Sequence, residues 1–105
     1  MELRAKILTQ AKDAVMHSRA ATHGDAERNF SMIANVWSVR LGVPITAAQV
    51  ALMMIDLKTS RAWENPEHED SWVDIAGYAA CGAELGLDIS KGYDSLENEV
   101  LGYQK

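Results

Sequence analysis

The sequence predicts an all-α protein, an antiparallel four-helix bundle that assembles into an oligomer. Four segments repeat apolar residues at the spacing of a helix, and none alternates apolar and polar residues as a strand would. Glycine, proline and favourable capping residues separate these segments. The chain has 105 residues, of which 48% are hydrophobic, as expected for one globular domain. We expect the bundle over residues 1–86 and a C-terminal tail over residues 87–105, which could carry one short helix at 95–101.

The first two helices are expected over residues 2–19 and 25–41. The first has on one face the apolar residues Leu3, Ile7, Ala11 and Ala14. The second begins at Asp25, a favourable N-cap residue. Its apolar stripe consists of Ala26, Phe30, Ile33, Trp37 and Leu41. Gly42, with Pro44 two residues later, predicts its end, because glycine adopts the left-handed conformation and proline cannot continue a helix.

The third and fourth helices are expected to form an antiparallel pair. Thr46 and Gln49 have the spacing of a capping box, which predicts the start of the third helix, and this helix continues to residue 64. The fourth begins within residues 67–71 and continues to residue 85, where Gly86 is expected to end it. The connector between them is short, and short connectors join antiparallel neighbours.

The third and fourth helices also carry the features that predict an oligomer. Residues 50–55 and Leu57 are apolar nearly all the way round the helix, so the third helix should be buried within the bundle or against another subunit. The fourth contains the small residues Ala76, Gly77, Ala79, Ala80, Gly82 and Ala83. Glycine within a helix costs about 1 kcal/mol relative to alanine, so we expect another backbone to approach closely there. Together these features predict a homo-oligomer, a dimer or higher.

Composition and charge exclude several classes of protein. Cys81 is the single cysteine, which excludes a disulfide framework and any zinc site with several cysteines. The net charge of −5 argues against nonspecific binding to nucleic acids. No apolar run approaches the ~20 residues that cross a membrane, and the N-terminus does not resemble a signal peptide. We therefore expect a cytoplasmic protein with no membrane or nucleic-acid partner.

Asp56 is the first candidate for chemistry, because it lies in the most apolar segment of the chain. An unpaired carboxylate is costly to bury, so Asp56 is expected to meet a cation, a metal ion or hydrogen-bond donors. An ion pair with another helix, without any catalytic role, would satisfy it equally well.

Asp70 and Asp74 form a second candidate site, one turn apart on the fourth helix. Acidic residues at a helix N-terminus complement the helix dipole, but Asp74 lies a turn deeper. Oxygen ligands on facing helices suit Mg²⁺ or Mn²⁺. In an antiparallel pair, at about 1.5 Å per residue, Asp56 and Asp74 would lie within about one turn of the same level. Three carboxylates could then line one pocket, with Lys58 or Arg61 at its rim.

Further polar and aromatic residues could contact a ligand. The connector before the second helix contains His23 and Asp25, and Asn29 follows, in a position where a helix N-terminus could bind an anion. An ordinary capped turn would explain part of this pattern. Trp63 and Trp72 could stack on a base, although tryptophan at helical spacing is more often part of a core.

The segments LMMIDLKTSR and DSWVDIAGYAAC, with THGD and NF before them, resemble a family of small phage and prophage helical proteins. That family is similar to the MazG-like all-α nucleotide pyrophosphohydrolases. The resemblance extends from about Thr22 to Gly86. It implies an oligomeric enzyme of a bacterial or infected bacterial cell that converts a nucleoside triphosphate to the monophosphate and pyrophosphate with Mg²⁺. The MazG signature is an E-x-x-E pair on one helix and an E-x-x-D pair on the next.

The residues match this signature in part. Asp74 corresponds to the final aspartate and Asp70 can fill the acidic position before it, whereas Ser71 stands in place of the usual second glutamate. The third helix offers Asp56 without an E-x-x-E pair. As an enzyme, the chain would hold Mg²⁺, or Mn²⁺, on Asp56, Asp70 and Asp74. The phosphates would face Lys58 and Arg61, and the base or sugar would meet the residues His23, Asp25, Asn29, Trp63 and Trp72.

Two other functions remain open at the level of the sequence. The same pocket could bind or sequester a nucleotide without turnover. The chain could also be a structural helical oligomer, in which the acidic residues are ion-paired and the alanine–glycine helix is the interface.

Overall fold

The computed structural model describes residues 2–18 and 26–87, and within them all regular structure is helical. Its α-helices are α1 (Leu3–Asp13), α3 (Ala26–Leu41), α4 (Ala47–Glu64) and α5 (Glu69–Leu87), and a π-helical segment, η1 (Ala14–Ser18), follows α1. The all-α prediction is therefore confirmed for these residues, which contain no strand. None of these helices is long and apolar enough to cross a membrane.

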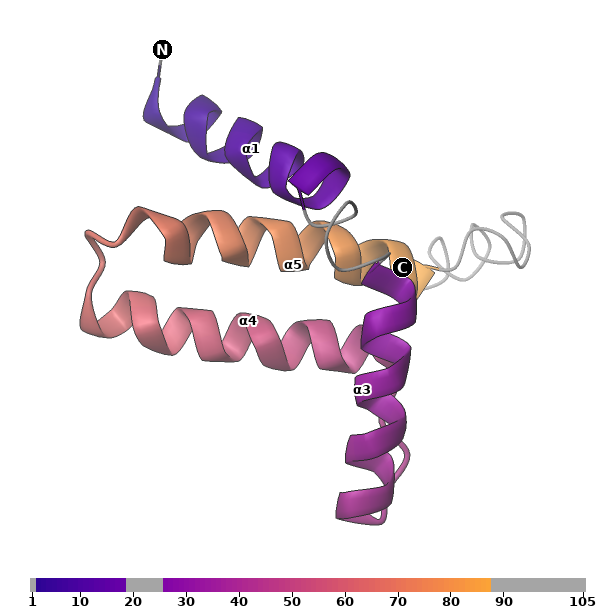
Figure 1. The fold of residues 1–105 in the computed structure, drawn as a ribbon. Helices are drawn as coiled ribbons and strands as arrows, with labels where there is room; N and C mark the ends of the chain where they lie inside the picture. Colours follow the sequence, from indigo (N-terminus) through magenta and orange to yellow (C-terminus); the bar gives the residue numbers. More distant parts are fainter. Residues whose placement is uncertain (1, 19–25, 88–105) are drawn as a thin grey trace, which may run out of the picture.

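An antiparallel hairpin of α4 and α5 forms the centre of the molecule (Figure 1). The predicted capping box starts α4: the Thr46 hydroxyl accepts from Gln49 N at 3.1 Å, and the Gln49 side chain accepts from Thr46 N at 2.9 Å. At the far end, Asn65 N donates to Arg61 O at 2.9 Å, and a connector of four residues leads into α5. The predicted antiparallel pairing is confirmed.

Small residues let α4 and α5 approach closely. A Cβ added to Gly82 would lie only 2.9 Å from the Cβ of Ala51, and one added to Gly86 would lie 3.5 Å from the Cβ of Ala48. The close approach predicted for the small-residue helix is thus present, but its partner is α4 of the same chain. The small residues therefore give no support to an oligomer.

The predicted end of α5 at Leu85 is wrong, because the helix continues through Gly86 to Leu87. Glycine tolerates a helical conformation, so Gly86 does not by itself end the helix, which continues beside Ala48 of α4. Gly42, by contrast, has φ of +70° and ends α3 as predicted. The expected N-cap Asp25 and the tail beyond Leu87 lie outside the described residues.

The helix α3 departs from the arrangement of a regular antiparallel bundle. α5 contacts both α1 and α4, whereas α3 runs across the end where α4 begins and α5 ends (Figure 1). Most of its apolar stripe is covered, because the buried Phe30 joins a core with Val50, Ala51 and Cys81, and the partly buried Ala26, Ile33 and Trp37 pack against that core. Leu41, the last residue of the predicted stripe, is 62% exposed. The other end of the hairpin is left without a fourth helix.

Candidate functional site

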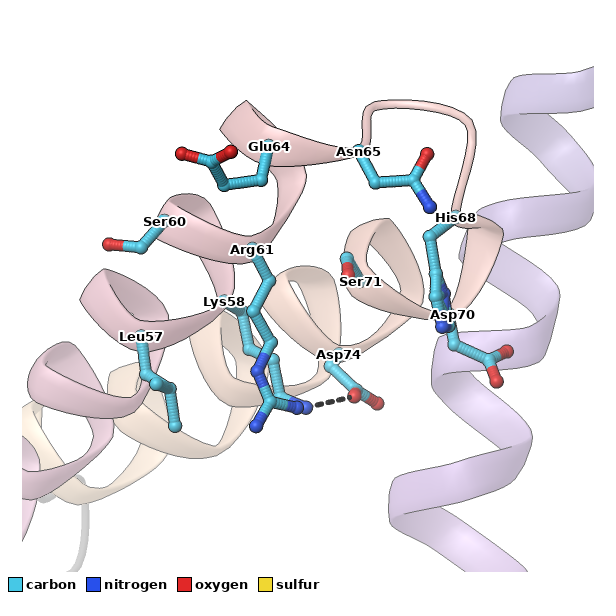
Figure 2. A pocket seen from close by; sticks show the side chains of 10 residues that line it. All are labelled: Leu57, Lys58, Ser60, Arg61, Glu64, Asn65, His68, Asp70, Ser71 and Asp74. Carbon is cyan, nitrogen blue, oxygen red and sulfur yellow. Dashed lines mark ion pairs between the residues drawn. The ribbon is translucent and has the colours of Figure 1, made fainter.

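A pocket of about 580 Å³ opens beside the end of the hairpin that α3 does not reach (Figure 2). The second half of α4, the connector and the first half of α5 supply its walls. Its lining residues are Leu57, Lys58, Ser60, Arg61, Glu64, Asn65, His68, Asp70, Ser71 and Asp74. Two permanent cations and three carboxylates thus share one pocket.

Lys58 and Asp74 form an ion pair across the pocket wall, from α4 to α5. The Nζ–Oδ2 distance is 2.9 Å, and the two side chains are 16% and 33% exposed (Figure 2). Such partial burial makes the attraction stronger than that of an exposed surface pair, because water screens it less. The pair joins the two helices and fixes both charged groups at the pocket.

Arg61 lies one turn beyond Lys58 on the same helix, and its side chain extends into the same region (Figure 2). Its guanidinium has no ion pair with any carboxylate within residues 2–18 and 26–87. A guanidinium presents several N–H donors in one plane, which suits a phosphate or a carboxylate. Arg61 is therefore the cation of the pocket that is available to an anionic ligand.

Asp70 and Asp74 both line the pocket, as predicted, but Asp56 does not. Asp56 is exposed, so the expectation that it lies in apolar surroundings is wrong. Ala51, which is fully buried, marks the side of α4 that packs in the core, and Asp56 lies about 140° away around the helix. The expected grouping of Asp56 with Asp70 and Asp74 is therefore absent. The described part of the chain also has no group of three or more His, Cys, Asp or Glu placed to hold a metal ion.

Of the residues predicted to meet a base or sugar, the three that the structure describes do not line this pocket. Trp63 is 86% exposed and is not part of the lining. Trp72 is held at the connector, where its indole N–H donates to Pro66 O at 2.9 Å. Asn29 lies on α3 and does not line the pocket, and His23 and Asp25 lie outside the described residues.

The sequence reasoning missed several lining residues, most clearly Glu64, His68 and Ser71. Glu64 shares the helix face of Arg61 at a spacing of three, so the helical period would have identified it. Ser71 is 4% exposed and occupies the position of the usual second glutamate of the MazG signature, which drew attention to its identity but not to its place in the pocket. His68 carried no signal, because its position depends on how the connector folds.

Comparison with known proteins places the chain in a family without assigning a function. A family model described as "Domain of unknown function (DUF6378)" matches residues 6–86. The "Gene 55 protein" of Mycobacterium phage L5 is 42% identical over 88 residues, which are 83% of this chain and 56% of that protein. The "Gene 55 protein" of Mycobacterium phage D29 is 36% identical over 75 residues, 71% of this chain and 50% of that protein. The chain thus spans about half the length of these curated relatives.

No solved structure matches the chain. Both relatives are phage proteins, which confirms the phage part of the predicted resemblance. The MazG part of the resemblance stays a prediction.

Proposed function

The chain belongs to the DUF6378 family, and we propose that it binds a nucleotide, together with Mg²⁺, in the pocket between α4 and α5. The observation that supports this function is the presence of Lys58 and Arg61 in one pocket with Asp70 and Asp74. Two cations in one pocket suit phosphate groups, and the two carboxylates suit the metal ion that accompanies those phosphates. The volume of about 580 Å³ lies within the range of small-molecule sites.

The donor set fits Mg²⁺ that enters with the nucleotide. Mg²⁺ in proteins is commonly held by one or two carboxylates, several waters and the phosphates of a substrate. Asp70 and Asp74, one turn apart on α5, would supply the carboxylates, while Arg61 would bind phosphate oxygens in a bidentate manner. When bound, the metal ion would neutralise phosphate charge.

The reaction that we propose is hydrolysis of a nucleoside or deoxynucleoside triphosphate to the monophosphate and pyrophosphate. Water adds to the α-phosphorus and gives up a proton to the surrounding solvent, the bond from that phosphorus to the bridging oxygen breaks, and pyrophosphate leaves. Support comes from the resemblance to MazG-like enzymes, in which Asp74 and Asp70 correspond to acidic positions of the signature. Lys58 and Arg61 would stabilise the charge that develops on the phosphates.

Binding without turnover is the second candidate function, and one observation favours it. Ser71 stands at the pocket where the MazG signature has a glutamate, and Asp56 lies outside the pocket, so the site offers fewer acidic groups than the signature. A protein with this site could sequester a nucleotide without cleaving it.

The decisive experiment is a binding titration of the protein with a panel of ribo- and deoxyribonucleoside triphosphates in the presence of Mg²⁺, followed by an assay of pyrophosphate release. Binding with release supports the hydrolase, and binding without release supports the second candidate. If no nucleotide of the panel binds, both candidate functions are wrong, and the remaining alternative is a structural helical oligomer.

We also propose that the chain forms a homodimer through the outer face of α3. Met32, Val36 and Val39 are 59%, 49% and 84% exposed, and Val39 lies about 180° around the helix from the buried Phe30. A helix with a covered apolar stripe and an uncovered one on its opposite side suits a position between a core and a partner.

A second copy fits this stripe because the stripe is nearly symmetric about Val36. In an antiparallel contact across a twofold axis, Met32 of one copy meets Val39 of the other, and Val36 meets its own equivalent. Three side chains fall short of the roughly 800 Å² per partner in a standard interface. The exposed Leu41 and Val43, at the end of α3, would extend the contact.

A further inference from the structure

The ion pair between Lys58 and Asp74 constrains what can enter the pocket. Both groups line the pocket, and the same two side chains are the ones that the proposed function assigns to phosphate and to metal. In the structure they neutralise each other at 2.9 Å. A ligand that uses either group must therefore separate the pair or share one of its charges.

A divalent cation alone meets an obstacle at Asp74. It would have to displace the Lys58 ammonium or share the carboxylate with it at close range. The displaced Lys58, which is only 16% exposed, would then lose its counter-ion, and an unpaired charge in a partly buried position is costly. Asp70 by itself is a single exposed carboxylate.

A nucleotide without metal meets the converse obstacle. Its phosphates could attract Lys58 and Arg61, but they would then lie beside the three carboxylates Glu64, Asp70 and Asp74 of the same pocket. Water screens the repulsion from the exposed Glu64 and Asp70, but it screens the half-buried Asp74 less, so the repulsion is strongest at Asp74. If Lys58 turned to the phosphates, Asp74 would lose its cation.

Both obstacles disappear when metal and phosphate arrive together. Lys58 exchanges the Asp74 carboxylate for a phosphate oxygen, and Asp74 exchanges Lys58 for the metal ion, so neither group is left without a counter-charge. Lysine suits this exchange because its flexible stem can reorient the ammonium without moving the helix. We infer that the Lys58–Asp74 pair couples the two binding events, so that metal ion and nucleotide phosphates bind this pocket together and only weakly one at a time. This inference rests on the proposed nucleotide function.

The test measures binding, independently of any turnover. Mn²⁺ serves as a paramagnetic probe, whose free concentration is followed by electron spin resonance, and the nucleoside triphosphate that binds best in the panel is titrated with and without it. For the unaltered protein we expect each ligand to bind at least about tenfold more tightly in the presence of the other, within the usual range of coupling between sites.

Two variants should remove the coupling, each by removing one partner of the Lys58–Asp74 ion pair. Lys58→Met frees Asp74 and should let the protein bind Mn²⁺ alone more tightly than the unaltered protein does. Asp74→Asn frees Lys58 and should let it bind the nucleotide equally well with and without Mn²⁺. Lys6→Met, which removes the ion pair of 3.2 Å between Lys6 and Glu69 outside the pocket, should leave the coupling unchanged. Circular dichroism verifies that each variant is folded.

Different results separate this inference from the proposed function. If the unaltered protein binds the nucleotide equally well with and without Mn²⁺, the function survives and the coupling is wrong. The coupling is also wrong if both variants keep it, since the ion pair would then be a permanent link between α4 and α5. If no nucleotide binds under any condition, the proposed function fails and the coupling fails with it.

Discussion

Arg61 is the residue on which the proposed phosphate contact depends most directly. It reaches the pocket without a carboxylate partner within residues 2–18 and 26–87, whereas Lys58 already has one in Asp74. An unpaired guanidinium at a pocket attracts an anion without first giving up another contact. Its loss should therefore weaken ligand binding with little effect on the fold.

We expect Arg61→Gln to weaken binding of the metal–nucleotide complex about 10- to 100-fold, because a hydrogen bond to a charged group contributes about 1.5–3 kcal/mol. Isothermal titration calorimetry measures the change. Arg4→Gln is the matched control, since Arg4 lies on α1 outside the pocket. Equal affinities for Arg61→Gln and the unaltered protein would remove Arg61 from the site.

At the level of single residues, the sequence predicted part of the pocket. The helical spacing of Asp70 and Asp74 predicted that they share a face, and the short connector predicted that α5 returns beside Lys58 and Arg61. The exposure of Asp56 could not be predicted from a segment that is apolar on nearly all sides, because periodicity then gives no direction for the core. Only the packing of α5 against Ala51 determines that Asp56 faces water.

Among the elements, the hairpin of α4 and α5 depends on two glycines with different surroundings. Gly82 faces Ala51 so closely that a Cβ would lie 2.9 Å from the Ala51 Cβ, while Gly86 has ordinary contact distance to Ala48. Cβ atoms are fixed to the backbone, so the crowding at Gly82 cannot be relieved by turning a side chain.

Gly82→Ala should lower the free energy of unfolding by about 1 kcal/mol, since steric strain of about 1–3 kcal/mol exceeds the gain in helix propensity of about 1 kcal/mol. Gly86→Ala is the matched control and should be neutral or stabilising by up to about 1 kcal/mol. Urea denaturation measures both. The double variant Gly82→Ala with Ala51→Gly should remove the strain, and equal effects of Gly82→Ala and Gly86→Ala would contradict this view.

The sequence predicted a helix boundary correctly where residues next to the boundary determine it. The capping box at Thr46 and the positive φ of Gly42 need only the residues beside them. Gly86 resembled Gly42 in sequence, yet α5 continues through it to Leu87, alongside Ala48 of α4. Such tertiary contacts, like the crossing of α3, are absent from the local pattern.

For the whole molecule, the outer stripe of α3 determines the expected assembly. We expect Val36→Arg to convert the dimer to a monomer at micromolar concentration, because it would bring two positive charges together at the twofold axis. Light scattering coupled to size-exclusion chromatography measures the mass. Leu8→Arg, at an apolar residue on α1 that is even more exposed than Val36 (64% against 49%), is the control and should leave the dimer intact. A monomeric unaltered protein would refute the proposed interface.

The packing of α1 against α5 has a consequence for the order in which the chain folds. Val15, in η1 directly after α1, lies so near Gly77 that a Cβ added there would be 3.3 Å from its Cγ1, and Lys6 of α1 pairs with Glu69. Both approaches join positions about sixty residues apart, whereas the hairpin of α4 and α5 closes through a connector of four residues. Closing a long loop costs more chain entropy than closing a short one, so the hairpin should form first and α1 should dock late. Native-state hydrogen exchange should then show α1 opening at a lower free energy than α4 and α5, and α1 substitutions should mainly speed unfolding.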